Sequence, residues 1–196
     1  MSSHNSDTRT RILESTWRLM EQHRGQGVRI QDIAKAAGVS RQAVYLHFPS
    51  RAELLIATTR YVDEIHQLDE RLRPLREAEN AVESLNAFVV FWADYIPEVY
   101  GLAKALLALY ETDSDAAAAW DDRMEALRQG CWAVVKGLKN ENILAPEWNE
   151  TEAVDWMWML MGLQNWENLT RLSGWSPSLY IRSMQTTLQK IFVRQQ

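Results

Sequence analysis

Residues Ile30–Glu53 read IQDIAKAAGVSRQAVYLHFPSRAE, and this stretch predicts two short helices joined by a tight turn. Apolar residues recur at three- and four-residue steps in its first part, which predicts the first helix. These residues are Ile30, Ile33, Ala34 and Ala37. Gly38 follows them, and glycine can adopt the left-handed backbone conformation that ends a helix sharply.

The second helix of this stretch is expected to begin at Ser40, whose hydroxyl can accept a hydrogen bond from a free backbone N–H. Val44 and Phe48 lie four residues apart and are expected to face a core. The remaining side chains are polar and are left to point elsewhere. Such an arrangement is a helix-turn-helix with a polar second helix, the element that enters the major groove of DNA in these motifs.

The run DIAKAAGVSRQAVYLHFPSRAELL resembles the N-terminal domain of the TetR/AcrR family of transcriptional repressors. The resemblance extends from about Thr8 to Thr58, and three features carry it together: the Ala-Gly-Val-Ser turn, the Tyr-Leu-His-Phe end and the following Pro-Ser-Arg-x-Glu-Leu-Leu. It implies a DNA-binding domain at the N-terminus and a helical domain behind it that binds a ligand and dimerises.

The net charge of −5 is unevenly distributed along the chain. Up to Leu55 there are eight basic and five acidic residues, a net charge of +3, and the remainder has 13 basic and 21 acidic residues, a net charge of −8. A basic end on an acidic chain predicts a polyanion as partner of that end. Chance variation in surface charge is the alternative interpretation.

Several classes of protein are not expected from this sequence. The start, MSSHNSDTRT, lacks the apolar core of a signal peptide, and the longest apolar stretch, around Trp156–Leu163, is about half of what a membrane span needs. We therefore expect a cytoplasmic protein without membrane contact. Cys131 is the only cysteine and the four histidines are scattered, so we expect no disulfide, metal or cofactor. No nucleophile–base or phosphate-loop motif is present, and we do not expect an enzyme.

Helical periodicity predicts an all-α protein of about nine helices. The domain boundaries that we expect are 8–53 for the helix-turn-helix domain, with the first part of a linking helix to about residue 68, and 54–196 for a helical ligand-binding and dimerisation domain. The first helix is expected over Thr8–His23, with Asp7 or Thr8 as its cap. The fourth is expected to begin at Arg51 behind a capping box and to run to about Arg73.

The later helices are delimited by prolines, glycines and capping residues. A fifth is expected to stop near Pro97, a sixth to cover Glu98–Tyr110, and a seventh to be capped by Ser114. An eighth is expected from Asn149 to Gly174, and a ninth begins with Ser176 and Pro177.

The eighth helix has almost no polar face around Val154–Leu163. A helix that is apolar all round is buried all round, so one face is expected to meet the core and the other a second copy of the chain. This predicts a homodimer through Met157–Leu172 and Tyr180–Phe192. The resemblance implies the same four-helix interface.

The residues that we expect to contact a near-palindromic DNA operator lie in and around the helix-turn-helix. Arg and Gln can read base edges with two hydrogen bonds, while Tyr, His and an Arg at a helix start are typical phosphate ligands. Solvated helix surface is the alternative, above all for Arg29. The candidates are Arg29, Ser40, Arg41, Gln42, Tyr45, His47 and Arg51.

Eight of the nine tryptophans lie in the larger domain, where they favour an apolar site for a small molecule. Core and dimer packing is the alternative for each of them. The expected partner is a small hydrophobic or aromatic effector whose charge stays open. The candidate lining residues are Trp92, Tyr95, Trp120, Met124, Cys131, Trp156 and Gln164.

Together these features predict a ligand-responsive transcriptional regulator, with a repressor implied by the family resemblance. In the implied mechanism a dimer holds two recognition helices about one helical turn of DNA apart, and the ligand spoils this spacing through the fourth helix. The alternative is an architectural or cell-cycle DNA-binding protein without a small ligand.

Overall fold

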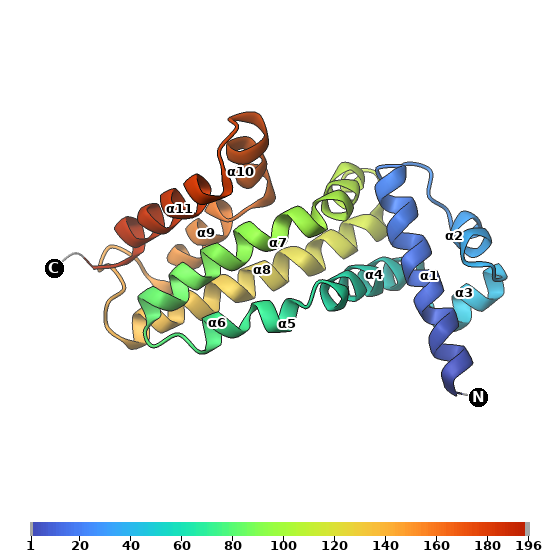
Figure 1. Cartoon of the computed structure of the whole chain (residues 1–196), viewed down its shortest axis with the longest axis horizontal. Helices are drawn as coiled ribbons and strands as arrows, with labels where there is room; N and C mark the ends of the chain where they lie inside the picture. The colour runs from blue at the N-terminus through green and yellow to red at the C-terminus, as the bar shows by residue number, and fades with distance from the viewer. Residues whose placement is uncertain (1, 195–196) are drawn as a thin grey trace. The chain divides into compact units, whose positions relative to one another are not determined.

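The structure is a computed structural model that describes residues 2–194 (Figure 1). Over these residues the chain is helical, and its only β-type pairing is an isolated antiparallel bridge between Leu144 and Val193. The all-α fold predicted from the sequence is therefore confirmed. The helices are α1 Ser2–Gln22, α2 Ile30–Ala37, α3 Arg41–His47, α4 Arg51–Ile65, α5 Leu68–Arg71, α6 Arg73–Arg76, α7 Ala81–Leu109, α8 Ser114–Asn140, α9 Glu150–Leu160, α10 Leu163–Glu167, the π-helix η1 Asn168–Leu172 and α11 Pro177–Phe192.

The helices form two compact units. The first unit comprises the chain up to His66 together with residues 99–124, and the second comprises residues 67–98 together with the chain from Glu125 onward. The long helices α7 and α8 each contribute to both units. The C-terminal part of α7 and the N-terminal part of α8 thus belong to the same unit as the helix-turn-helix.

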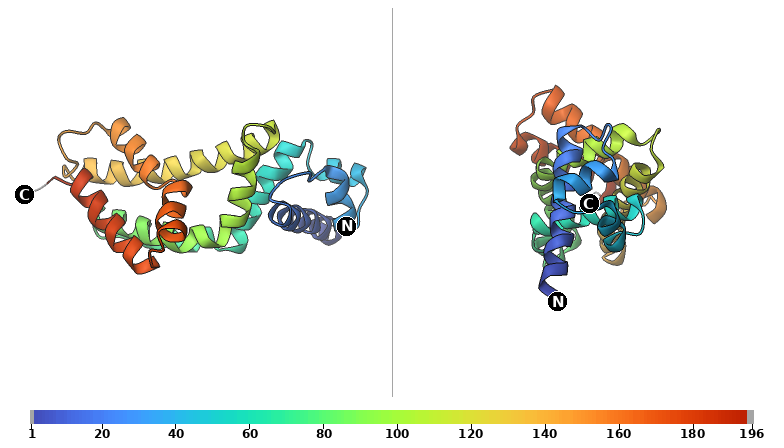
Figure 2. Two further views of the ribbon diagram at one scale, coloured as in Figure 1. Left: turned by 90° about the horizontal axis from the view of Figure 1, so that it is seen from above. Right: turned by 90° about the vertical axis from the view of Figure 1, so that its right-hand side faces the viewer.

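The helix-turn-helix forms as the sequence predicts. All four apolar residues of α2 that share one face are buried, as are Val44 and Phe48. Gly38 ends α2 with a φ of 67°, in the left-handed region, and the Ser40 hydroxyl accepts a hydrogen bond from the backbone N–H of Ala43 at 3.0 Å. The polar side of α3 is therefore left outside the core. Figure 2 shows α2 and α3 next to α1 from two further directions.

Helix α1 begins at Ser2, six residues before the predicted start, so neither Asp7 nor Thr8 caps it. Helix α4 ends at Ile65 rather than near Arg73, because Gln67 has a φ of 55° and breaks the helical path. Two short helices, α5 and α6, follow instead of a continuous linking helix. The Ser50 hydroxyl caps α4 as predicted, by accepting a hydrogen bond from the backbone N–H of Glu53 at 3.1 Å.

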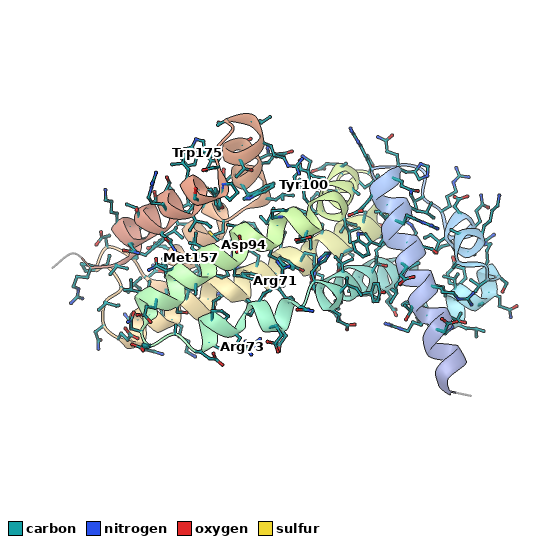
Figure 3. All side chains as sticks on the ribbon, viewed as in Figure 1. Arg71, Arg73, Asp94, Tyr100, Met157 and Trp175 are labelled. Atoms are coloured by element: carbon teal, nitrogen blue, oxygen red, sulfur yellow. The ribbon has the colours of Figure 1, made fainter. Side chains whose placement is uncertain are left out.

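The predicted helix break at Pro97 is wrong, because α7 passes through this proline without a break and is 29 residues long in total. Proline lacks the N–H that would bond the carbonyl four residues earlier, that of Ala93. The next carbonyl along, that of Asp94, accepts a hydrogen bond from the Arg71 guanidinium at 3.1 Å (Figure 3). The same guanidinium lies over the Tyr95 ring, 5.9 Å from its centroid. Contacts from α5 thus surround the helical turn that precedes Pro97.

The predicted eighth helix is divided into three pieces. Helix α9 ends at Leu160, and Gly162 has an extended backbone with a ψ of 147°, so that α10 begins in a new direction and passes into η1. The side-chain amide of Asn165 donates to the carbonyl of Met159 at 2.6 Å and satisfies part of the broken end. Two predicted caps in this region are confirmed: Asn149 caps α9, the first of the three pieces, and Ser176 caps α11 with Pro177 in the first turn.

The second unit packs around the N-terminal part of α7. Gly130 of α8 lies where a Cβ would meet the Phe88 ring at 3.0 Å, so the two helices approach closely. Helix α11 lies against the same part of α7, because Gln185 and Gln189 donate to the backbone and side chain of Asn86. The apolar face of α11 is buried in this unit through Tyr180, Met184, Leu188 and Phe192. Among the described residues no helix is both long enough and apolar enough to cross a membrane.

Candidate nucleic-acid interface

Helix α3 presents an exposed polar face. Arg41 and Gln42 are exposed in its first turn, and Tyr45 follows one turn later with 44% of its surface exposed. Buried Val44 fixes the opposite face in the core, so α3 cannot rotate without exposing it. Leu46 is 80% exposed beside Tyr45 and adds an apolar side chain to this surface.

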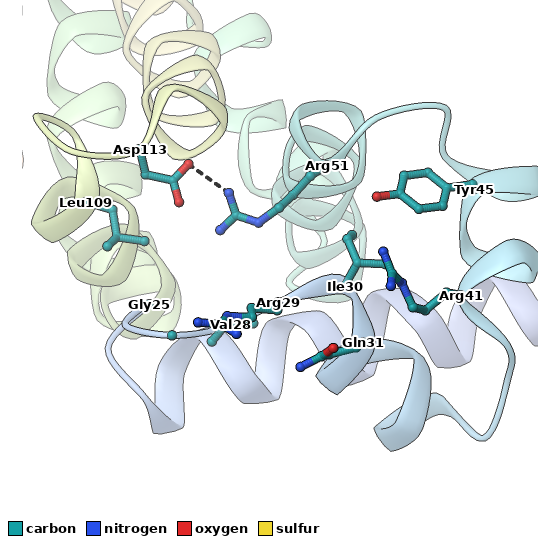
Figure 4. Close-up of a pocket in the computed structure, with 11 residues that line it drawn as sticks. Gly25, Val28, Arg29, Ile30, Gln31, Arg41, Tyr45, Arg51, Leu109 and Asp113 are labelled. Carbon is teal, nitrogen blue, oxygen red and sulfur yellow. Dashed lines mark hydrogen bonds and ion pairs between the residues drawn. The ribbon is translucent and has the colours of Figure 1, made fainter.

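A hollow of about 400 Å³ lies beside α3 and brings four of the seven predicted DNA-binding residues together (Figure 4). Arg29 reaches it from the start of α2, Arg41 and Tyr45 from α3, and Arg51 from the start of α4. Three guanidinium groups and a phenol thus line one open hollow. Guanidinium and phenol groups are common ligands of phosphate oxygens, so the hollow is suited to an anion.

The other three predicted residues lie outside this hollow. Ser40 is exposed, but its hydroxyl is used by the cap of α3. Gln42 is exposed on the same helix. His47 is partly buried, with its ring 6.3 Å from the ring of Phe48. Of these three, only Gln42 has its whole side chain available for a partner.

Arg51 differs from the other two arginines of the hollow because it is already paired. Its Nη1 donates to Asp113 Oδ1 at 2.7 Å and lies 3.3 Å from Asp115 Oδ2, and 17% of its side chain is exposed. Partial burial raises the pKa of Asp113, but the hydrogen bonds from Arg51 and from the N–H of Ala116 outweigh it and lower that pKa overall. Asp113 therefore stays ionised at neutral pH.

Two residues near the interface were not among the sequence candidates. The Arg9 guanidinium of α1 lies over the Phe48 ring, 5.1 Å from its centroid, and adds a cation beside the end of α3. Asp113 reaches Arg51 from the turn between α7 and α8, 62 positions away in the sequence. Neither has a sequence signal, because the distance along the chain hides both contacts.

The predicted ligand-lining residues are distributed over both units. Trp120 and Met124 belong to the first unit, where Trp120 packs against the hydrophobic core. The other five belong to the second unit. Trp92, Tyr95 and Cys131 are buried there, and burial raises the pKa of the Cys131 thiol to about 12, so the thiol stays protonated. Trp156 is half-exposed beside Trp148, with ring centroids 6.0 Å apart, and Gln164 is exposed.

Two buried donors in the second unit have no hydrogen-bond partner among the described residues: Trp92 Nε1 and the Tyr180 hydroxyl. Burial raises the pKa of Tyr180, so its hydroxyl keeps its proton. An unpaired buried donor costs about 1–3 kcal/mol, and a molecule that supplies an acceptor would recover part of that cost. Tyr180 was not among the sequence candidates for ligand contact, and its range, Tyr180–Phe192, was predicted to form the dimer interface.

Residues 12–58 match the family model described as "Bacterial regulatory proteins, tetR family". The nucleoid occlusion factor SlmA of Marinomonas sp. (strain MWYL1) is 28% identical over 109 residues, which cover 55% of this chain and 54% of that protein. The HTH-type transcriptional regulator TtgR of Pseudomonas putida is 34% identical over 79 residues, which cover 40% of this chain and 36% of that protein. The chain therefore matches about half or less of the length of these relatives.

The fold extends beyond the matched sequence. A crystal structure of a protein from Saccharomonospora viridis, in complex with choline, superposes with a TM-score of 0.73 over 97% of this chain and 100% of that chain, at 20% sequence identity. The family model covers the helix-turn-helix, and the same helical fold continues over the remainder of the chain. Residues 12–58, which contain the helix-turn-helix, are thus similar to the bacterial regulatory proteins of the tetR family.

Proposed function

We propose that this protein is a DNA-binding transcriptional repressor that releases its operator when a small ligand binds. The observation that carries the proposal is the exposed polar face of α3 beside a hollow lined by three arginines. An acidic surface there would repel DNA and a neutral one would not attract it, whereas this one offers cations for phosphates and polar side chains for bases.

The two kinds of contact are expected to come from different residues. Arg41 and Gln42 are exposed at the start of α3 and are suited to base edges. Tyr45 and Arg51 are suited to phosphates at the edge of the groove, and Arg29 adds positive charge beside them. Phosphate contacts fix the register of the protein on DNA, and base contacts select the sequence.

A homodimer would supply two copies of α3 to a near-palindromic site. Support comes from apolar side chains that the second unit leaves open: Trp156 and Met159, three residues apart on α9, are half-exposed, and Leu172 at the end of η1 is 77% exposed. Monomeric proteins rarely expose large apolar side chains in such groups, because water contact is costly. Met157 is buried in its own chain, so the contact is expected through Trp156 and Met159.

The ligand is proposed to be a hydrophobic or aromatic molecule that carries a hydrogen-bond acceptor. Buried Trp92, Tyr95 and Tyr180 of the second unit supply apolar surface, and Trp92 and Tyr180 also supply the two unpaired donors. The similar protein from Saccharomonospora viridis was solved with choline, which supports a small-molecule site in this fold. The match to a family of regulatory proteins favours a regulator over an architectural or cell-cycle protein.

Selection from random DNA duplexes tests the DNA-binding half of the proposal. We expect a near-palindromic site, bound with a dissociation constant in the nanomolar range, which is typical of specific regulators. Recovery of no preferred sequence would contradict the proposal.

A thermal-shift screen of varied apolar compounds, followed by DNA-release assays on the hits, tests the ligand half. A ligand that binds the folded protein raises its melting temperature with the logarithm of excess ligand. Tyr180→Phe keeps the ring and removes only the donor, so it should weaken binding of the hits. Trp92→Phe also removes a donor, although it replaces the indole by a smaller ring, and should weaken binding as well. Hits that stabilise the protein and leave DNA bound would contradict a ligand-driven release.

A further inference from the structure

Arg51 is held by one end of its guanidinium only. Both ion pairs are made by Nη1, with Asp113 at 2.7 Å and Asp115 at 3.3 Å. Its Nε and Nη2 have no hydrogen-bond partner among the described residues, and the side chain lines the hollow next to Arg29 and Tyr45 (Figure 4). A guanidinium has five donors in a rigid fork, so a group that fixes one end leaves the other end aimed in a defined direction.

Asp113 is itself held in place by the start of α8. Its Oδ1, the oxygen that accepts from Arg51, also accepts from the backbone N–H groups of Asp115 and Ala116, each at 3.1 Å. Asp113 is therefore the N-cap of α8, where the sequence had predicted Ser114. A carboxylate with three donors on one oxygen cannot swing freely, and it transmits its position to Arg51.

We propose that Asp113 is a positioning residue for DNA binding, which fixes the Arg51 guanidinium so that its free donors meet a DNA phosphate at the rim of the hollow. The inference rests on the proposed DNA-binding function and deepens it. The turn between α7 and α8 then contributes to DNA binding by holding Arg51 in place, although this turn lies outside the helix-turn-helix in the sequence.

The geometry indicates that Asp113 supports the contact of Arg51 with a phosphate and does not compete with the phosphate for Arg51. A phosphate that had to displace Asp113 would break a charge-assisted hydrogen bond and leave the Asp113 carboxylate without its cationic partner. A phosphate that binds Nε or Nη2 leaves that bond intact and adds a second anion to the same cation. The Arg51 side chain is then already ordered in the free protein, so DNA binding does not have to restrict its conformations further.

The test uses a double-mutant cycle with the full-length protein and a fluorescent operator duplex. Asp113→Asn keeps an oxygen for the α8 cap and removes the charge that holds Arg51. Arg51→Ala removes the guanidinium that is proposed to contact the DNA phosphate. Glu111→Gln is the matched control, because Glu111 is an exposed acid of the same turn and has no bond to Arg51. Like Asp113→Asn, Glu111→Gln removes one negative charge from this turn.

We expect Asp113→Asn to weaken DNA binding about tenfold, the size of one charge-assisted hydrogen bond, and Glu111→Gln to leave it unchanged or slightly stronger. In the Arg51→Ala background, Asp113→Asn should have no further effect. Arg51→Lys should also weaken binding, because an ammonium lacks the two-ended fork.

Two results would overturn the inference. Tighter binding by Asp113→Asn than by Glu111→Gln would show that Asp113 competes with DNA for Arg51. An equal loss from Asp113→Asn with and without Arg51 would show that Asp113 acts through the fold alone. Either result leaves the binding of the unmodified protein as a separate measurement of the proposed function.

Discussion

At the scale of single residues, Arg41 and Arg51 carry the same guanidinium in different surroundings. Arg41 is exposed on α3 and free to follow a base edge, whereas Arg51 is mostly buried and anchored to Asp113. The chemistry of each arginine therefore depends on its neighbours. Residue type alone identified both as DNA-binding candidates, and only the structure distinguishes an adaptable contact from a fixed one.

Arg41→Ala and Gln42→Ala are each expected to change which base is preferred at one position of the site. Loss of one two-bond contact to a base edge costs about 1–3 kcal/mol at that position. Competition binding with single-base variants of the operator measures this effect. An equal loss on all sequences would mean that the residue contacts phosphate instead.

Gly25 and Gly27 form a matched pair for a stability measurement. Both have positive φ, 76° and 70°, which L residues adopt at a cost of about 1–2 kcal/mol. A Cβ at Gly25 would also lie 2.8 Å from the carbonyl oxygen of Ala105, whereas at Gly27 nothing lies within 4 Å. We expect Gly25→Ala to lower the free energy of unfolding clearly more than Gly27→Ala, as measured by urea denaturation. Equal losses would show that the turn does not pack closely on α7.

At the scale of elements, local signals predicted most helix starts, and long-range contacts decided the rest. The caps at Ser40, Ser50 and Asn149 depend on residues three positions apart, so the sequence shows them directly. The passage of α7 through Pro97 was not predictable from local signals, because proline usually ends or kinks a helix and the neighbouring contact from Arg71 to Asp94 comes from another helix. The cap of α8 was misplaced by one residue for a different, local reason, since both Asp113 and Ser114 are good caps.

The candidate site follows the same division. The exposed side of α3 was predictable from periodicity, because buried Val44 and Phe48 determine which side chains point outward. The meeting of Arg29, Arg41 and Arg51 in one hollow depends on how α2, α3 and α4 pack, and no spacing in the sequence encodes it. The sequence therefore predicted candidate residues for the interface and not their geometry.

Ion pairs join α4 to α8 within the first unit. Arg60 pairs with Asp122 at 2.7 Å, and Arg123 pairs with both Asp63 and Asp122. Together with the Arg51–Asp113 pair, they tie both ends of α4 to the first part of α8. These contacts explain why this part of α8 forms one compact unit with the helix-turn-helix.

The stabilising effect of these pairs should depend on pH. Burial raises the pKa of Asp122, but Arg60 and Arg123 outweigh it, so that its pKa in the folded protein lies below the usual 3.8. The stabilisation is complete above that usual value and is lost as the pH falls through the lower folded pKa. Asp122→Asn should therefore cost on the order of 1 kcal/mol at pH 6 and progressively less toward pH 2.5. Urea denaturation over this range measures the difference, with Glu111→Gln as control. A difference that is constant with pH would exclude this role.

At the scale of the whole molecule, the exposed apolar side chains of α9 predict self-association. Trp156→Glu together with Met159→Lys should convert a dimer into a monomer that binds the operator poorly, because two linked copies of α3 bind more tightly than one. Light scattering at micromolar concentration measures the mass. Val90→Glu alters an exposed apolar residue of α7 in the same unit and serves as control. An unmodified protein with the mass of a single chain would show that the surface has another role.

The central claim is that the polar face of α3 and the arginine-lined hollow bind DNA, and the dependence of operator affinity on salt tests it most directly. The logarithm of the affinity falls linearly with the logarithm of salt concentration, with a slope that counts phosphate contacts. We predict that Arg51→Ala reduces this slope by about 1 per bound chain and weakens binding to all sequences alike. Gln42→Ala should leave the slope unchanged. Arg182→Ala removes an exposed charge on α11 and should change neither the slope nor the affinity. A slope that Arg51→Ala leaves unchanged, with affinity equal to that of the unmodified protein, would contradict the account.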